Sequence, residues 1–325
     1  MIQNEQPIWN VERPWIKEQI ILSAFQDLLR TLQTIDSLPG GIIFSELEGI
    51  RLSLDVFLDA TYDLLSSINV FKGESERPNF WNRPGRMNIK KMELRIQRGV
   101  FSATMAAMAL VDHSRIFANN YPIEHYQERI KESFSENPLH RFIQSLRNFM
   151  THVRITKNNW VTEWDKQGRS VFFILTATDL NKWDGWDSQS KSYIQSNPEG
   201  VNVEQLFDNY STRIKLFHDW LHCQVWVKNS EELREYIACK RVYDAVNARS
   251  MWSLLLKQIF PQKKINPYMY LDKYLSDNEI EEVLSLPFRS KSQVDRIIEL
   301  VDEYCCCDKE LRKATYALFE VIPQL

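Results

Sequence analysis

The sequence predicts a mainly helical protein, and its Gly and Pro usage and apolar periodicity lead to that prediction. The chain of 325 residues contains only 9 Gly, and its 12 Pro lie between segments whose apolar residues recur at helical spacing. A hydrophobic fraction of 44% is enough for a sizeable core, and a charged fraction of 26% is ordinary. The length fits one large domain or two ordinary ones.

The N-terminal part is expected to hold three helices. The first runs from Pro14 to about Ser37, where Pro39-Gly40-Gly41 is expected to end it. The second runs from Ser45, which begins a capping box, to about residue 70. Residues 72–88 contain two Pro and two Gly and are expected to form a long loop. A third helix follows over about 89–119.

The middle of the chain changes period and predicts a β-hairpin at about 159–178. Its residues are β-branched and aromatic, and Gly168 lies in the connection between the two strands. A long helix follows to about Val227, and two capping boxes, Ser276/Glu279 and Ser290/Gln293, predict further helices near the C-terminus. We therefore expect a helical domain over 1–227 that includes the hairpin, and a separate C-terminal helical region over 228–325.

One predicted helix, Asn137 to Arg154, has a single apolar stripe with polar shoulders. Asn137 is a suitable N-cap and Pro138 suits the first helical position. The stripe consists of Leu139, Phe142, Ile143, Leu146, Phe149, Met150 and Val153. At about 100° per residue, Arg147 and His152 project about 110° to either side of the stripe's centre. The helix therefore buries one face and presents Arg147, Asn148 and His152 beside it.

These three residues form the motif R-N-x-x-x-H, and here the chain resembles the HEPN superfamily over about Phe101 to Trp226. Nuclease members carry R-x4–6-H near the end of a bundle helix, usually with a polar residue after the Arg. The chain is similar to HEPN-like bacterial ribonuclease toxins and defence effectors. The resemblance implies a HEPN-like helical bundle and a cofactor-free homodimer. It also implies a metal-independent endoribonuclease that leaves a 2′,3′-cyclic phosphate, acting as a toxin or anti-phage effector. An antitoxin or activator protein is a candidate partner.

The same residues suit RNA cleavage on chemical grounds. The 2′-hydroxyl of RNA is the nucleophile, His152 suits proton transfer near neutral pH, and the Arg147 fork suits phosphate oxygens. The neutral amide of Asn148 can hold either Arg147 or His152 in position by a hydrogen bond. Because Arg147 and His152 lie about 140° apart around one helix, a two-fold partner would be needed to bring Arg and His into one cleft.

Four basic residues are candidates for RNA binding. Lys91, Arg95 and Arg98 share one helical face, and Arg154 follows the motif. The alternative is an ordinary solvated surface. The net charge of −3 does not indicate a strongly basic nucleic-acid binder overall.

Two alternatives to the nuclease remain open. The first is a non-catalytic HEPN-like interaction or scaffold protein, because fold does not fix function. The second is a metal-dependent enzyme that uses His218 and His222, whose i, i+4 spacing can hold zinc. Asp219 stands where zinc proteases carry Glu, and the sequence offers no clear third ligand. Three adjacent cysteines at 305–307 cannot converge on one metal from a helix.

The expected location is the cytoplasm. The sequence has no basic-then-apolar N-terminal signal and no apolar run of membrane-spanning length, so no membrane partner is expected. Five cysteines, an odd number, fit a reducing compartment better than a disulfide framework.

Overall fold

The structure is a computed structural model that describes residues 6–135, 138–155, 158–165, 168–263 and 265–322. It is mainly helical with one small antiparallel sheet of strand order β1-β2-β3, which confirms the predicted class. The contacts divide the chain into two compact units, residues 43–230 and residues 1–42 with 231–325. We call them the central unit and the terminal unit and describe each by itself.

The central unit contains the predicted motif helix and the hairpin. Its elements are α3 (Pro39–Ser75, which begins in the terminal unit), η2 (Arg83–Gly85), α4 (Arg86–Asn120), α5 (Tyr126–Ile130), η3 (Lys131–Ser135), α6 (Leu139–His152), β1 (Asn158–Asp165), β2 (Gly168–Leu175), α7 (Ala177–Leu180), α8 (Ser188–Gln195), β3 (Val201–Asn202) and α9 (Val203–Lys228).

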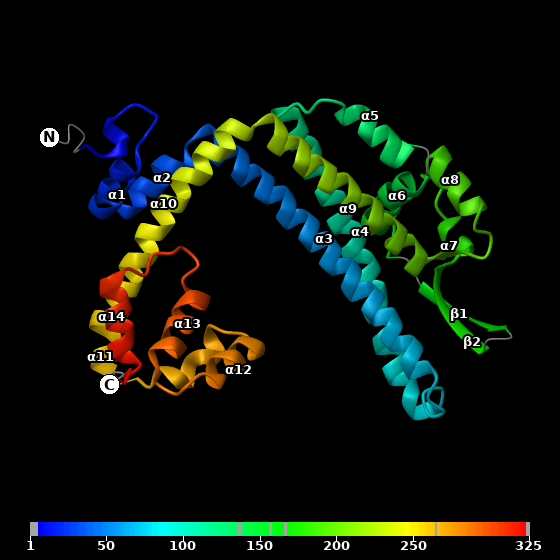
Figure 1. Ribbon diagram of the computed structural model, residues 1–325. Coiled ribbons are helices and arrows are strands. Elements are labelled where there is room, and N and C mark those ends of the chain that lie inside the picture. The colour runs from blue at the N-terminus through cyan, green and yellow to red at the C-terminus, as the bar shows by residue number, and fades with distance from the viewer. Residues whose placement is uncertain (1–5, 136–137, 156–157, 166–167, 264, 323–325) are drawn as a thin grey trace. The chain divides into compact units, whose positions relative to one another are not determined.

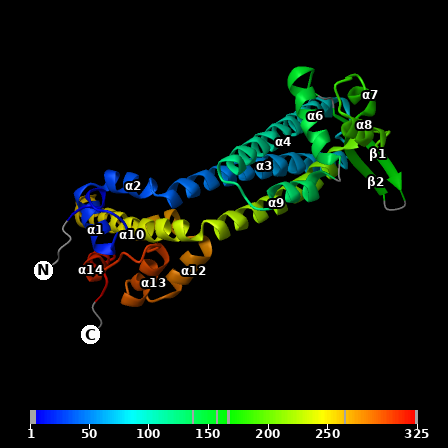
Figure 2. The same cartoon turned by 90° about the horizontal axis from the view of Figure 1, so that it is seen from above.

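Three long helices, α3, α4 and α9, run alongside one another in the central unit (Figures 1 and 2). Gly99 of α4 lets this helix approach α3 closely, because a Cβ there would lie 3.0 Å from Leu64 Cδ1. The rings of Phe57 on α3 and Tyr210 on α9 meet nearly at a right angle, with 5.9 Å between the ring centroids. Aromatic and small residues thus join the three helices in one core.

The predicted hairpin is present and lies against the long helices. β1 pairs with β2 in antiparallel register from Asn158↔Leu175 to Asp165↔Gly168, and β3 adds a short third strand. The buried Phe173 ring meets the Phe71 ring of α3 at 4.8 Å between centroids. The indole Nε1 of Trp160 donates to Glu93 Oε1 of α4 at 2.9 Å. One face of the hairpin is therefore part of the core of the central unit.

The terminal unit is built from helices of both chain ends. Its elements are η1 (Ile8–Asn10), α1 (Lys17–Gln26), α2 (Leu28–Asp36), α10 (Ser230–Leu254), the π-helical turn η4 (Leu255–Ile259), α11 (Phe260–Lys263), η5 (Pro267–Lys273), α12 (Asp277–Ser285), α13 (Lys291–Val301) and α14 (Lys309–Leu318). The predicted capping box Ser276/Glu279 is present at α12, and the Ser290 side chain accepts from Gln293 N at the start of α13.

The grouping of the first 42 residues with the C-terminal helices differs from the domain of 1–227 expected from sequence. Two side-chain contacts show why: Tyr236 Oη donates to Asp36 Oδ1 at 3.3 Å, and Arg13 pairs with Glu235 at 3.1 Å. Gly40 packs so closely on the backbone of α10 that a Cβ would lie 2.0 Å from the carbonyl oxygen of Glu232. Contacts between residues some 200 positions apart leave no periodic signal in the sequence.

The predicted helix end near Ser37 is confirmed, whereas two other features of the first hundred residues differ from the prediction. After α2 ends at Asp36, Pro39-Gly40-Gly41 begins α3, because Pro in the first turn loses no intrahelical hydrogen bond. Asp27 divides the first predicted helix in two, since its side chain accepts from Arg30 N and caps α2. The loop expected over 72–88 is shorter, as α3 continues to Ser75 and α4 begins at Arg86.

Within the described ranges, no helix has the length and apolar character needed to span a bilayer.

Candidate functional site

The motif residues lie on α6, whose apolar stripe anchors it in the central unit. Six of the seven predicted stripe residues are buried: Leu139, Phe142, Ile143, Leu146, Phe149 and Met150. Phe142 stacks on Trp186 with 5.6 Å between ring centroids. The seventh, Val153, is 47% exposed, so its predicted burial is wrong. The helix ends at His152, and Val153 therefore no longer continues the helical face. The expected N-cap, Asn137, lies outside the described residues.

A polar contact on the buried side of α6 fixes this helix against α8. Ser145 Oγ donates to Asp187 Oδ2 at 2.8 Å, and the same carboxylate accepts from Ser190. Burial raises the pKa of Asp187, but the hydrogen bonds from Ser190 and Ser145 outweigh this and hold the pKa below its ordinary value. The carboxylate therefore stays charged and ties the two helices together.

Arg147 is half-buried on α6 and is held by its neighbour. Its Nη1 donates to Asn148 Oδ1 at 3.1 Å, and its backbone carbonyl accepts from Thr151 Oγ1 at 2.8 Å. Among the residues that the structure describes, no acidic side chain forms an ion pair with Arg147. The charge of the guanidinium is thus available to an anion. Of the two side chains that Asn148 was expected to hold, it orients Arg147 and not His152.

His152 is the last residue of α6, and its side chain is exposed. The residues after it include two exposed apolar side chains, Val153 at 47% and Ile155 at 51%. Within the described part of the chain, no hydrogen bond joins Arg147 to His152. One α6 therefore presents the two side chains separately, as their angular spacing of about 140° requires.

A groove beside the end of α6 gathers the predicted basic residues. Its lining consists of Lys91, Leu94, Arg95, Gln97, Arg98 and Phe101 of α4 together with Ile155, and its volume is about 470 Å³. We call this the α4 groove. Ile155 lies only three residues beyond His152, and Thr151 Oγ1 approaches Met105 Sδ of α4 at 3.8 Å. The segment that directly follows the motif helix thus forms part of the groove.

The charges of the α4 groove are open to solvent. Lys91, Arg95 and Arg98 are exposed, and none of them pairs with a carboxylate in the described ranges. Leu94 between them is 64% exposed. Three unneutralised cations with an apolar floor can hold the phosphates and bases of a nucleic-acid strand. Leu94, Phe101 and Ile155 were not singled out from sequence, although Leu94 and Phe101 share the helical face of the three basic residues.

Arg154, the fourth predicted RNA-binding residue, does not line the α4 groove. Its Nη2 pairs with Asp179 Oδ1 at 2.9 Å, and its guanidinium carbon lies 5.9 Å from the centre of the Phe149 ring. Asp179 also pairs with Lys182. Through these contacts, Arg154 helps to pack α6 against α7.

The histidines of the rival metal site are engaged elsewhere. His218 is buried, with Nε2 at 2.9 Å from Ser114 Oγ and Nδ1 at 2.8 Å from the carbonyl oxygen of Ile214. Burial lowers the pKa of His218, so its ring is neutral. His222 Nε2 accepts from Trp226 Nε1 at 3.1 Å. Over the described ranges, no three His, Cys, Asp or Glu side chains cluster closely enough to hold a metal ion. Both ring nitrogens of His218 thus have partners within the core.

Comparison of the chain with protein-family models, with curated proteins and with solved structures finds no match.

Proposed function

We propose that this protein is a metal-independent endoribonuclease with Arg147, Asn148 and His152 as its site, acting as a toxin or anti-phage effector. The observation that supports it best is that the open charge of Arg147 and the exposed ring of His152 lie on a helix whose end borders the basic α4 groove. A strand in that groove would bring a phosphodiester to the end of α6.

His152 and Arg147 have different roles in the proposed reaction. The 2′-hydroxyl attacks the adjacent phosphorus, which breaks the bond to the 5′-oxygen and leaves a 2′,3′-cyclic phosphate and a 5′-hydroxyl. Imidazole takes the hydroxyl proton or supplies a proton to the leaving oxygen. Arg147 stabilises the charge that grows on the phosphoryl oxygens, and Asn148 holds the guanidinium in position. The nucleophile belongs to the substrate, so the reaction needs no metal.

The proposed site contains two copies of α6. Arg147 and His152 of one chain are about 140° apart, so one chain supplies Arg147 and its partner supplies His152 across a two-fold axis. The exposed Val153, which does not line the α4 groove, gives this face apolar area that a second chain would cover. A homodimer therefore carries two equivalent clefts.

The experiment is cleavage of total and transfer RNA by the purified protein in excess EDTA, beside the variants His152→Ala and His222→Ala. The expected result is cutting by the wild type and by His222→Ala, with a loss of about a hundredfold or more in His152→Ala, as for removal of a general acid or base. His222→Ala is the matched control because it replaces another exposed histidine, the one in the metal alternative. Cutting that EDTA abolishes would contradict the metal-independent mechanism.

A second candidate is a non-catalytic interaction module, which the exposed pair Val153 and Ile155 favours. In that case Arg147 and His152 would bond across a protein interface. The absence of RNA cleavage by the wild type, with a change of oligomeric state in His152→Ala, would favour this reading over the nuclease.

A further inference from the structure

The terminal unit contains a large apolar cavity that the proposed RNA site does not use. Its volume is about 800 Å³, within the usual range for small-molecule sites. Its wall is formed by side chains of α10, η4, α13 and α14, among them Trp252, Leu255, Leu256, Ile297, Leu318 and Phe319. A second cavity of about 630 Å³ shares Leu256, Phe260 and Leu318 with it. The two cavities therefore adjoin, and the second also has polar lining residues, among them Asn266, Arg289 and Glu320.

The polar groups of these cavities are few. In the lining of the first, Thr315 Oγ1 already donates to the carbonyl oxygen of Leu311 at 2.9 Å. In the lining of the second cavity, Arg289 pairs with Glu320 at 2.7 Å. Lys263 is exposed at the edge of the first cavity, and no carboxylate of the described residues pairs with it. Among the described lining residues, Lys263 is thus the cation without a carboxylate partner, while the hydroxyls of Tyr270 and Tyr274 also line the first cavity and Arg289 Nε in the second has no hydrogen-bond partner.

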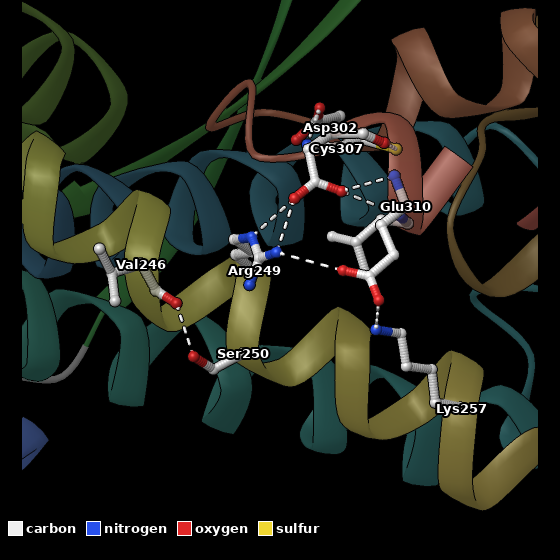
Figure 3. A network of polar contacts seen from close by, with 9 residues as sticks. Val246, Arg249, Ser250, Lys257, Asp302, Cys307 and Glu310 are labelled. Atoms are coloured by element: carbon white, nitrogen blue, oxygen red, sulfur yellow. Dashed lines mark hydrogen bonds and ion pairs between the residues drawn. The ribbon is translucent and has the colours of Figure 1, made fainter. Parts of the chain in front are cut away.

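Hydrogen bonds and ion pairs join α10 and η4 to the start of α14, and other residues of these elements line the cavity (Figure 3). Lys257 of η4 donates to Glu310 Oε1 of α14 at 2.6 Å. Arg249 of α10 donates to Asp308 Oδ2 at 2.6 Å, while Asp308 Oδ1 accepts from the first backbone N–H groups of α14. The π-helical turn η4 is thus fixed against α14. π-Helical turns are rare overall, and those that occur are often found at functional sites.

We propose that this cavity binds a long straight-chain carboxylic acid, with the chain among the apolar side chains and the carboxylate at Lys263. A chain of methylene groups makes no hydrogen bonds, so the apolar walls suit it and burying it is favourable. A single anionic end matches the single open cation. A nucleotide or sugar would leave its many polar groups unpaired against these walls.

The test is displacement of a fluorescent dansyl-labelled undecanoic acid from the full-length protein by palmitic acid and by hexadecanol. Wild-type protein should bind the probe and release it to palmitic acid. Lys263→Gln should weaken palmitic acid about tenfold and leave hexadecanol unchanged, because only the acid carries a charge. Lys273→Gln, which removes a lysine outside both cavities, should change neither.

A second pair of variants tests the chain-binding part. Leu255→Trp fills the cavity and should block probe, acid and alcohol alike, whereas Leu284→Trp, at an exposed leucine outside both cavities, should bind as the wild type. No probe binding by the wild type would overturn the proposal. So would unchanged binding by Leu255→Trp, or equal weakening of acid and alcohol by Lys263→Gln.

Discussion

At the scale of single residues, the proposed site contains an Arg that is oriented but that no described acidic residue neutralises. The contact of Arg147 with Asn148 is a hydrogen bond to a neutral amide, so the guanidinium keeps its full charge. Exchange of this Arg for Lys would keep the charge and lose the planar fork that binds two phosphate oxygens at once.

We therefore expect Arg147→Ala to lower the rate of RNA cleavage by about a hundredfold or more, as for the loss of one transition-state donor. Arg147→Lys should retain an intermediate rate. The measurement is single-turnover cleavage of a defined RNA, together with urea unfolding. Arg141→Ala is the matched control, since Arg141 lies on the same helix, is exposed and, among the described residues, donates a hydrogen bond to Gln144. Equal loss in both variants would mean that the charge of α6, not the position of Arg147, is what matters.

His140, at the start of the same helix, makes stability depend on pH. Burial, with the charges of Arg141 and Arg115, lowers the pKa of His140 to about 4, and its Nδ1 lies 2.9 Å from Tyr210 Oη. The folded ring stays neutral while the unfolded ring takes up a proton near its ordinary pKa of 6.5. The stability is therefore complete above that value and is lost as the pH falls from 6.5 towards 4.

The expected loss of unfolding free energy from His140 over this window is on the order of 3 kcal/mol, from about 1.4 kcal/mol per pKa unit. His140→Gln should make the dependence shallower, and buried His218 adds a contribution of the same sign. Urea unfolding of both proteins at about pH 7 and about pH 4.5 measures it. Parallel losses in wild type and variant would show that His140 does not titrate on unfolding.

At the scale of elements, the sequence is most informative where the helical period is long and unbroken. The stripe of α6 predicts its burial through Met150 and fails only at Val153, where the helix has ended. Arg147 and His152 could be placed on its shoulders for the same reason. The α4 groove could be predicted only in part, because Ile155 reaches it from a different segment and contacts between segments leave no local pattern.

The α4 groove carries its own prediction. Replacing Lys91, Arg95 and Arg98 together by Gln should weaken binding of single-stranded RNA and reduce the slope of log affinity against log salt by about 2, since each phosphate contact contributes about 0.7. Fluorescence anisotropy over a salt series measures both.

The control replaces Arg51, Arg77 and Arg115 by Gln, since each of these is exposed and already paired with a carboxylate three residues away. It removes the same formal charge and should leave the slope nearly unchanged. Equal slopes for the two triple variants would mean that RNA responds to net charge and not to the groove.

At the scale of the whole molecule, the two chain ends form one unit and the proposed RNA site lies in the other. The sequence alone predicts that residues 1–42 belong to the same domain as the motif helix, because it shows only which residues are close along the chain. In the structure, residues 1–42 instead pack with the C-terminal helices, as the hydrogen bond between Tyr236 of α10 and Asp36 of α2 shows. The proposed catalytic site requires a dimer, because Arg147 and His152 of one chain do not meet.

The most direct test of the proposed site is a heterodimer of the two inactive variants. Arg147→Ala and His152→Ala chains, co-expressed with different tags and purified through both, contain one cleft with an intact Arg from one chain and an intact His from the other. We predict that each variant homodimer is inactive in EDTA, and that the heterodimer cuts RNA at about half the wild-type rate, because one of its two clefts is complete. A heterodimer as inactive as either homodimer, or chains that do not copurify, would contradict the account.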